Sequence, residues 1–471
     1  MIKVIVTAFQ DHYISSATHD NNEILDPPRC HPGTRISFLN QLSNWVKDTS
    51  SPVYITWLHG PAGAGKSAIA RSLAEILQDE SLLAGSFFFH MDPKRNSEKP
   101  LVITLAQQLA FSIPETRGYI ADSVERDPVF FSRSLQTQFE KLIVNPIIQL
   151  NLASSSFQPA LMIIDGLDEC KDPKARRLIL NTLYDASQRL QGYLKFLVAS
   201  RPEHDIQGFF ETTTGERINL IDILTDIRAH EDVRVYLCDQ FKRIKQEHHL
   251  HLTFDSNWPT QDAIQSLVEK SSGHFIYAST VIKYIENAYD RPQKRLDDII
   301  NLRQSSVNPY TELDALYLNI LSLAKGDQKL LVNILSAALV CGSVGDPYSS
   351  FYPRHWAPRD TANLDRVVES VLALEPNDVQ LALLDLKSLI GLREQFDIPP
   401  LASGSKLIHG KSLAGHSYPN IRHIKFWHKS FSDFLFDSTR SKEFCIQVQL
   451  AHMTVAKGCL QLLDNSKMMK K

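Results

Sequence analysis

A glycine-rich octapeptide between an apolar run and an amphipathic run constrains this chain more than any other feature. Residues 53–58 before it are apolar, and in residues 66–78 after it the apolar side chains recur at helical spacing. The octapeptide fits the pattern G-x-x-x-x-G-K-[ST] and consists of Gly60, Pro61, Ala62, Gly63, Ala64, Gly65, Lys66 and Ser67. The motif and its flanks predict a strand, a phosphate-binding loop and a helix in direct succession.

The residue types of this loop suit a nucleoside triphosphate bound with Mg²⁺. Small residues let backbone N–H groups turn inward around phosphates, and the helix that begins at Lys66 directs its positive dipole end toward them. We expect Lys66 to pair with the β- and γ-phosphates and the Ser67 hydroxyl to join the Mg²⁺ shell. The alternative is a glycine-rich turn that binds nothing, and the strand and helix flanks argue against it.

A second apolar run ends on three carboxylates, about 100 residues beyond the loop, in the arrangement of a Walker B motif. Ligands of open α/β sheets collect at the carboxyl ends of the strands, so Asp165 is expected to hold the Mg²⁺ shell through water. Glu169 is expected to orient or deprotonate an attacking water. Asp168 either belongs to the same catalytic group or caps the helix that follows.

A third apolar run, residues 194–199, is followed by Ser200, Arg201 and Pro202. An arginine at the end of a strand can reach the γ-phosphate of a nucleotide bound at the same sheet edge. The alternative is a surface arginine before a proline. The sequence leaves both interpretations of Arg201 open.

The order of apolar runs predicts several domains in the 471 residues. Residues 1–29 read as polar and irregular, and we expect a flexible lead there. From about residue 51 to residue 225, short apolar runs alternate with helical patterns, which predicts an α/β fold: a parallel sheet with helices on both faces. The expected strands are 53–58, 86–90, 160–164, 194–199 and 218–223.

Beyond residue 225 the strand signals fade and helical periodicity dominates. We expect one helical domain at 226–305 and a further C-terminal region at 306–471. The helical segments are 231–244, 263–284, 314–323 and 329–340.

Composition narrows the expected partners and location. The chain is 43% hydrophobic and 22% charged with a net charge of -3, and it lacks the basic excess of a nucleic-acid binder. Its six cysteines form no CxxC pair, which suits a reducing compartment. No signal peptide and no apolar run long enough to cross a bilayer is visible. We therefore expect a cytoplasmic protein with neither nucleic acid nor membrane as a partner.

Taken together, the loop, the Asp165–Glu169 string and the Ser200-Arg201-Pro202 string make the chain resemble the NACHT NTPases of the STAND class, fungal type. Six further segments look similar to those found in that family: 30–35, 57–60, 86–89, 104–110, 273–280 and 428–435. The resemblance implies that 30–225 is a NACHT P-loop NTPase domain and that 306–471 is winged-helix-like and helical.

The resemblance also implies a function. ADP would keep a closed form, and exchange for ATP would favour an open form that self-associates or signals to an effector protein. By analogy, Thr34 and Arg35 lie against the nucleotide base and His428 contacts the bound phosphates. The alternatives are a turn before a helix and a core histidine.

Two departures from the family pattern limit these implications. Related proteins often carry a proline after the glycine that here is Gly273, but His274 and Phe275 follow it, so we expect no base contact from that segment. Neither an effector domain nor a repeat array is visible, which suggests a minimal member or an incomplete gene model.

Three functions remain open on the sequence. The leading one is a regulatory NTPase with slow ATP hydrolysis. The others are a conventional P-loop ATPase or phosphotransferase, and a scaffold that binds nucleotide without hydrolysing it. The stimulus, the effector and the choice of ATP over GTP are not encoded in any motif.

Overall fold

The computed structural model describes most of the chain, and its described part divides into two compact units. The first unit comprises Met1–Glu247 with Asp255–Ala278, and the second comprises His248–Phe254 with Ser279–Lys471. The described residues are 2–21, 27–153, 159–190, 192–213, 217–225, 228–287, 290–302, 311–324, 326–343, 364–395, 421–426 and 428–468.

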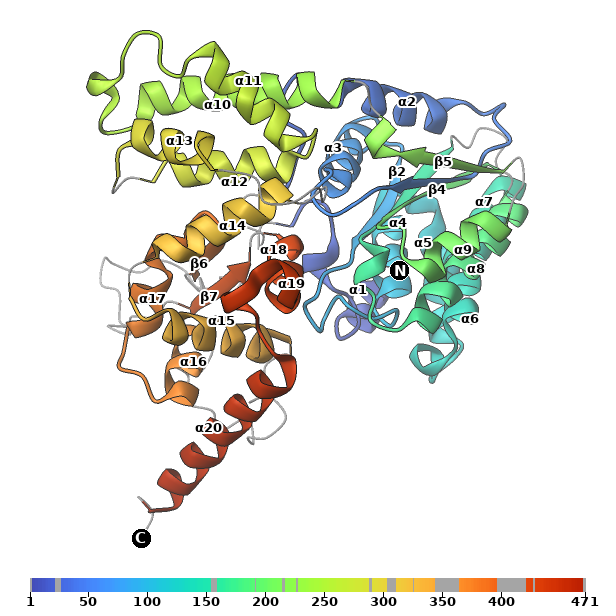
Figure 1. The fold of residues 1–471 in the computed structure, drawn as a ribbon. Helices are drawn as coiled ribbons and strands as arrows, with labels where there is room; N and C mark the ends of the chain where they lie inside the picture. The colour runs from blue at the N-terminus through green and yellow to red at the C-terminus, as the bar shows by residue number, and fades with distance from the viewer. Residues whose placement is uncertain are drawn as a thin grey trace, which may run out of the picture. The chain divides into compact units, whose positions relative to one another are not determined.

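The first unit is built on a five-stranded parallel sheet with the strand order β2-β3-β4-β1-β5 (Figure 1). All five predicted strands are present. Only β2 begins earlier than expected, because its first residues pair with β3 across a register shift at Gly85. The strands are β1 Ile55–His59, β2 Leu83–Phe88, β3 Ala160–Asp165, β4 Leu194–Ser200 and β5 Ile218–Asp222.

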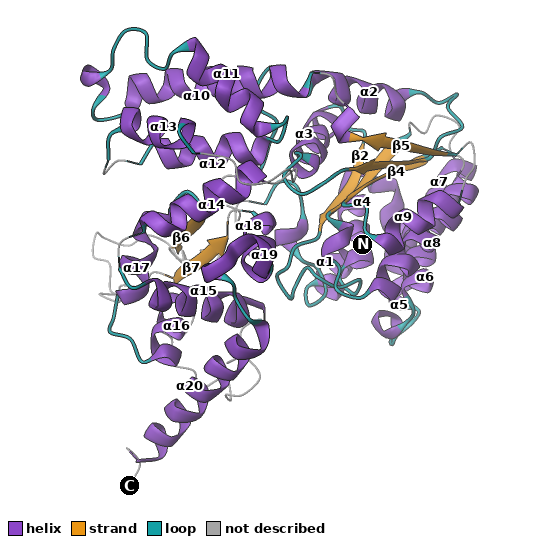
Figure 2. Ribbon diagram, viewed as in Figure 1, coloured by secondary structure: helices purple, strands orange, loops and turns teal. Residues whose placement is uncertain are grey.

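Helices cover both faces of this sheet, as the alternation of strands and helical patterns predicted (Figure 2). On one face, Trp57 and Phe196 pack into a core with α4 Leu101–Ser112 and α8 Pro173–Leu190. Smaller helices complete that layer: α5 Arg117–Glu125, α6 Leu135–Phe139, α7 Asn145–Ala153 and α9 His204–Thr212.

The opposite face is covered by α2 Ile36–Lys47 and α3 Lys66–Asp79. Leu58, Ile163 and Leu197 point to that side, since successive strand side chains alternate between faces. The carboxyl ends of β1, β3 and β4 lie together, with β4 between the other two. Whatever follows these three strands therefore meets at one edge of the sheet.

The N-terminal residues differ from the expectation of a flexible lead. Residues Ile2–Phe9 form α1, whose Ile5 and Phe9 are buried in the same core as Trp57. His19 is also buried, and its backbone N–H donates to Ser86 Oγ at 3.1 Å. Two apolar residues four apart form one helical stripe, and the sheet layer supplies a surface for it.

The first unit continues through α10 Ala229–Glu247 and α11 Gln261–Ser271 into the start of α12 Phe275–Ile285. Helical periodicity runs across 263–284, but the helix breaks between α11 and α12. Ser272 and Gly273 have φ values of +47° and +77°, and this left-handed pair ends α11.

The described part of the second unit is mostly helical, as expected, and also contains one antiparallel pair of strands. The antiparallel pair β6 Ile390–Gln395 and β7 Ile421–Phe426 lies where no strand was expected, because no tight-turn signal joins the two. The helices are α13 Pro292–Ile300, α14 Thr311–Leu323, α15 Gln328–Ser343, α16 Leu364–Leu372, α17 Asp378–Leu383, α18 Lys429–Phe436, α19 Ser438–Ser441 and α20 Val448–Met468.

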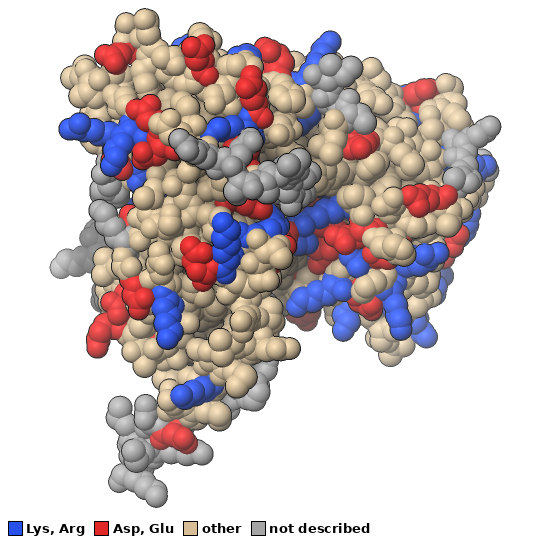
Figure 3. Space-filling model, viewed as in Figure 1, with Lys and Arg blue, Asp and Glu red and all other residues tan. Residues whose placement is uncertain are grey.

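Two further features concern the apolar character of the helices and the charge on the surface. Among the described residues, no helix combines the length and apolar character needed to cross a membrane. On the face seen in Figure 3, Lys and Arg side chains are interspersed with Asp and Glu side chains.

Candidate nucleotide-binding site

The glycine-rich loop lies between the carboxyl end of β1 and the N-terminus of α3. Its glycines all have positive φ: +155° at Gly60, +75° at Gly63 and +100° at Gly65. A Cβ on Gly60 would lie 2.3 Å from Ile223 Cγ2, and one on Gly63 would lie 2.2 Å from Ile276 Cγ2. A Cβ on Gly65 would meet nothing within 4 Å. Two glycines thus permit close packing, and the third borders open space where a ligand can approach the backbone.

Lys66 is the first residue of α3 and is held by the loop itself. Its Nζ donates to the backbone carbonyl oxygens of Gly60 and Pro61, each at 2.9 Å. Burial lowers the pKa of this lysine to about 8, against the opposing effect of the nearby Asp168 and Asp165 carboxylates. A phosphate oxygen would be a stronger partner for this ammonium group than a neutral carbonyl.

Asp165 ends β3 and is almost fully buried, with 3% of its surface exposed. Its Oδ1 has no hydrogen-bond partner among the described residues. Burial raises the pKa of Asp165 to about 6, and the neighbouring Ser67 hydroxyl and the Lys66 charge oppose that shift. Carboxylate and hydroxyl oxygens are the ligands Mg²⁺ prefers. The orphaned oxygen beside Ser67 therefore fits a magnesium site, with Ser67 and Asp165 as its protein groups.

Asp168 and Glu169 lie on a short 3-10 turn, Leu167–Glu169, directly after β3. The turn begins at Gly166, which has φ +70°, and a Cβ there would lie 3.2 Å from the Phe89 carbonyl oxygen. Both carboxylates contribute to the electrostatic environment of Lys66. The two predicted catalytic acids are therefore at the same sheet edge as the loop, and the role of each stays a prediction.

Arg201 follows β4 and is joined to Asp168. The Arg201 backbone N–H donates to Asp168 Oδ1 at 3.1 Å, and Arg201 Nε lies 3.4 Å from Asp168 Oδ2. The Asp168 side chain is 4% exposed and that of Arg201 is 21% exposed, so this arginine is not simply a surface residue. The pair brings together two residues that the sequence had assigned separately.

Thr34 and Arg35 precede α2 and also reach the loop region. Thr34 is buried in a turn, with its Oγ1 donating to the His31 carbonyl oxygen at 2.7 Å. The Arg35 guanidinium Nη2 donates to the carbonyl oxygen of Ala64 in the loop at 3.2 Å. The expected contact of both residues with the nucleotide base stays a prediction.

Sequence reasoning missed a contact between the loop and the first turn of α12. The Ile276 backbone N–H donates to the Gly63 carbonyl oxygen at 3.3 Å. The Arg35 guanidinium also lies 5.1 Å from the Phe275 ring centroid. The only available signal was the Gly273-His274-Phe275 segment, which the family resemblance singled out without giving it this position.

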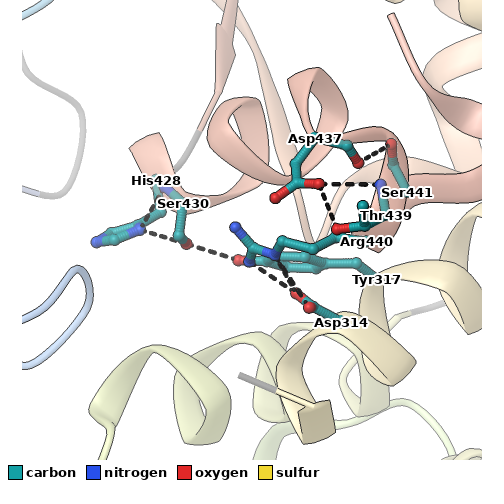
Figure 4. A network of polar contacts seen from close by, with 8 residues as sticks. All are labelled: Asp314, Tyr317, His428, Ser430, Asp437, Thr439, Arg440 and Ser441. Carbon is teal, nitrogen blue, oxygen red and sulfur yellow. Dashed lines mark hydrogen bonds and ion pairs between the residues drawn. The ribbon is translucent and has the colours of Figure 1, made fainter. Parts of the chain in front are cut away.

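His428 belongs to the second unit, where it caps α18 (Figure 4). Its Nδ1 accepts a hydrogen bond from the Ser430 backbone N–H at 3.0 Å and lies 2.6 Å from Ser430 Oγ. Ser430 Oγ in turn contacts Tyr317 Oη at 2.9 Å. His428 is thus a partly buried helix cap in a local network, and its contact with phosphates stays a prediction.

The sheet order, the loop and the acids at its edge define a P-loop NTPase-like fold. A protein-family model described as Nephrocystin 3, N-terminal, matches residues 33–201, a range that contains the loop, Asp165 and Arg201. No curated protein matches the chain.

Several solved structures are similar to the chain at low identity. The Walker-type ATPase PABY2304 of Pyrococcus abyssi is 14% identical, with 79% of this chain and 94% of that chain covered and a TM-score of 0.37. Cdc6p from Pyrobaculum aerophilum is 13% identical, with 78% and 89% covered and a TM-score of 0.35. The Aeropyrum pernix ORC2 protein, in ADPNP-ADP complexes, is 12% identical, with 80% and 90% covered and a TM-score of 0.35.

Proposed function

We propose that this chain is a regulatory NTPase that binds ATP or ADP with Mg²⁺ and acts as a conformational switch controlling self-association or partner signalling. The observation that carries the proposal is the incomplete charge compensation at the loop. Among the described residues, Lys66 Nζ donates hydrogen bonds only to backbone carbonyl oxygens, and the buried Asp165 keeps an oxygen without a hydrogen-bond partner. Bound Mg²⁺ and phosphates would complete both.

In this proposal, different residues of the site bind the phosphates, hold the metal ion and activate the attacking water. Lys66 binds the β- and γ-phosphates, and the loop from Gly60 to Ser67 offers its backbone N–H groups. Ser67 and Asp165 hold the Mg²⁺ ion, which would neutralise phosphate charge. Glu169 orients or deprotonates the attacking water, with Asp168 and Arg201 beside it.

The remaining contacts in the proposal come from the flanking segments. Thr34 and Arg35 lie on the side of the base, and His428 approaches the phosphates in the closed form. The domain division that goes with it is a NACHT-type NTPase domain at 30–225, a helical domain at 226–305 and a winged-helix-like region at 306–471. A cytoplasmic location is part of the same proposal.

A switch requires that a moving part should sense the nucleotide. The hydrogen bond from Ile276 to Gly63 supports this, since it joins the first turn of α12 directly to the phosphate loop. The resemblance to NACHT proteins and the match to the Nephrocystin 3 N-terminal family point to the same class.

The test combines nucleotide identification with a trapped state. Mass spectrometry of the nucleotide released from purified protein should find ADP or ATP. Glu169→Gln should then bind ATP with Mg²⁺ normally but hydrolyse it about 100-fold more slowly, because an amide cannot accept a proton from water. With ATP trapped, the Glu169→Gln protein should elute as a larger assembly on size-exclusion chromatography.

Asp165→Asn is the matched control, since it should weaken Mg²⁺-dependent binding itself and form no assembly. Fast turnover by the parent would favour a conventional ATPase or phosphotransferase. Unchanged size with ATP trapped would contradict the switch, and no hydrolysis by either protein would favour a nucleotide-binding scaffold.

A further inference from the structure

Arg35 is tied to the helical segment after the sheet through both its backbone and its side chain. It has φ +56°, precedes α2 and is only 3% exposed. Its backbone N–H donates to Asp232 Oδ2 at 2.9 Å, and its Nε lies 3.9 Å from the same oxygen. Asp232 lies in the first turn of α10. A guanidinium stays charged when buried, so this carboxylate compensates it where solvent cannot.

The other end of the guanidinium lies on the phosphate loop. Nη2 donates to the Ala64 carbonyl oxygen at 3.2 Å, and the guanidinium carbon lies 5.1 Å from the centroid of Phe275 and 5.8 Å from that of Phe38. The residue after Phe275 donates its N–H to the Gly63 carbonyl oxygen. Two consecutive loop carbonyls are therefore bound, one by Arg35 and one by α12.

Binding these carbonyls fixes the neighbouring N–H groups. In a planar trans peptide, the C=O of one residue and the N–H of the next point in opposite directions. Neither of these two peptide bonds is cis. Holding the Gly63 carbonyl on Ile276 therefore turns the Ala64 N–H away from α12, and holding the Ala64 carbonyl on Arg35 turns the Gly65 N–H away from Arg35. These are donors that a phosphate-binding loop offers to its ligand.

We propose that Arg35 is a positioning residue that orients the N–H donors of the phosphate loop and couples nucleotide binding to the first turns of α10 and α12. This inference rests on the nucleotide binding proposed above. It gives Arg35 a role that needs no contact with the base. By linkage, nucleotide that orders the loop also orders α12, and the reverse.

The experiment measures affinity and hydrogen exchange on the full chain. A fluorescent ATP analogue with Mg²⁺ reports affinity, and exchange of the amides at 275–280 is followed with and without that analogue. The parent should show slower exchange in this segment when the analogue binds. Arg35→Met should bind about 10- to 100-fold more weakly, in the range of losing one charged hydrogen bond that leaves its partner unpaired, and should lose the slowing in 275–280.

Arg29→Met is the matched control. Arg29 pairs with Glu75 at 2.6 Å, and its side chain is 48% exposed, so its loss should change neither measurement. Asp232→Asn should move both measurements in the same direction as Arg35→Met, by a smaller amount. A folded Arg35→Met protein with parental affinity and parental slowing of exchange would overturn the proposal.

A second variant covers the case in which Arg35→Met does not fold. Arg35→Lys keeps the charge but lacks the guanidinium that donates to the Ala64 carbonyl oxygen while lying near Asp232, so we expect about a 10-fold loss of affinity and a weaker response in 275–280. Parental values in Arg35→Lys would then contradict the inference. If the parent itself bound no analogue, and Lys66→Ala behaved like it, the proposed function would fail instead.

Discussion

Two groups of buried or half-buried polar side chains in this molecule differ in how completely their members form hydrogen bonds and ion pairs with one another. In the second unit, Arg440 donates three hydrogen bonds to Asp314: Nη2 to Oδ1 at 2.7 Å, Nε to Oδ2 at 3.0 Å and Nε to Oδ1 at 3.3 Å. Tyr317 also contacts Ser430 (Figure 4). In the first unit, Asp165 keeps an oxygen without a hydrogen-bond partner, and burial lowers the pKa of Lys66. A network that completes itself stabilises a fold, whereas an incomplete one is prepared for a ligand.

The largest effect should follow from removing the charge at the incomplete group. Lys66→Ala should weaken binding of Mg²⁺ and ATP by at least about 100-fold, since charged hydrogen bonds to phosphate are lost and the anion stays. Titration calorimetry or a fluorescent analogue would measure the change. Equal binding by the variant and the parent would remove the loop from the proposed function.

Lys195 provides a matched control, because it is a buried lysine on a neighbouring strand with no expected ligand. Its Nζ donates to the carbonyl oxygens of Trp45 and Asp48, each at 2.6 Å, at the end of α2. Lys195→Met should lower the free energy of unfolding by about 2 kcal/mol, because it leaves those carbonyls without their charged donor. Its nucleotide affinity should stay within about 3-fold of the parent, a change of under 1 kcal/mol.

The complete network should respond in stability rather than in binding. Arg440→Met leaves Asp314 partly buried without its partner, and we expect a loss of about 2 kcal/mol in the stability of the second unit. Urea unfolding with hydrogen exchange in α14 and α19 would locate the loss. A large drop in nucleotide affinity with an intact second unit would show instead that this network takes part in binding.

Substitutions at two loop glycines should separate an effect on stability from an effect on nucleotide affinity within one motif. Gly63→Ala should lower stability by about 2 kcal/mol, because its Cβ would collide with Ile276, and Ile276→Ala should recover part of that loss. In Gly65→Ala the new Cβ would contact no protein atom. The stability of this variant should fall by only about 1 kcal/mol, because alanine disfavours the positive φ of this position. Its affinity should fall more than that of the Gly63→Ala, Ile276→Ala double variant. Thermal melts and binding titrations on the same samples decide this.

The sequence predicted those parts of the molecule that depend on local pattern. The apolar runs placed all five parallel strands, and the loop motif placed Lys66 at the start of α3. The packing of α1 and the contacts from Arg35 and Ile276 to the loop were not predicted, since they join distant parts of the chain without a spacing rule. The pairing of β6 with β7 was not predicted for the same reason.

The smallest effects concern one carboxylate from each group and should have opposite dependence on pH. Burial raises the pKa of Asp165 to about 6 in the folded protein, above its ordinary value of 3.8. Hydrogen bonds from Thr439 lower the pKa of Asp437, a half-buried carboxylate next to Arg440 in the second unit (Figure 4). The folded state therefore favours the neutral form of Asp165 and the ionised form of Asp437.

Above pH 6, Asp165 is ionised in both the folded and the unfolded state. The full cost of burying its charge therefore lowers the free energy of unfolding in that pH range. As pH falls from about 6 toward 3.8, the folded state takes up the proton first and the loss is relieved. Asp165→Asn should thus make the nucleotide-free protein about 1 kcal/mol more stable at pH 7.5, with no gain near pH 4. Asp437→Asn should be less stable than the parent at pH 7.5 and should equal it at low pH, because the Asp437 contribution is lost as pH falls through its folded pKa.

Urea unfolding of the parent and both variants at pH 4, 6 and 7.5 gives the slope of the unfolding free energy against pH for each variant. Saturating Mg²⁺ and ATP should reverse the order for Asp165 alone, since only the parent then gains the bound cation. Parallel slopes for the two variants would contradict the distinction between an incomplete and a complete group.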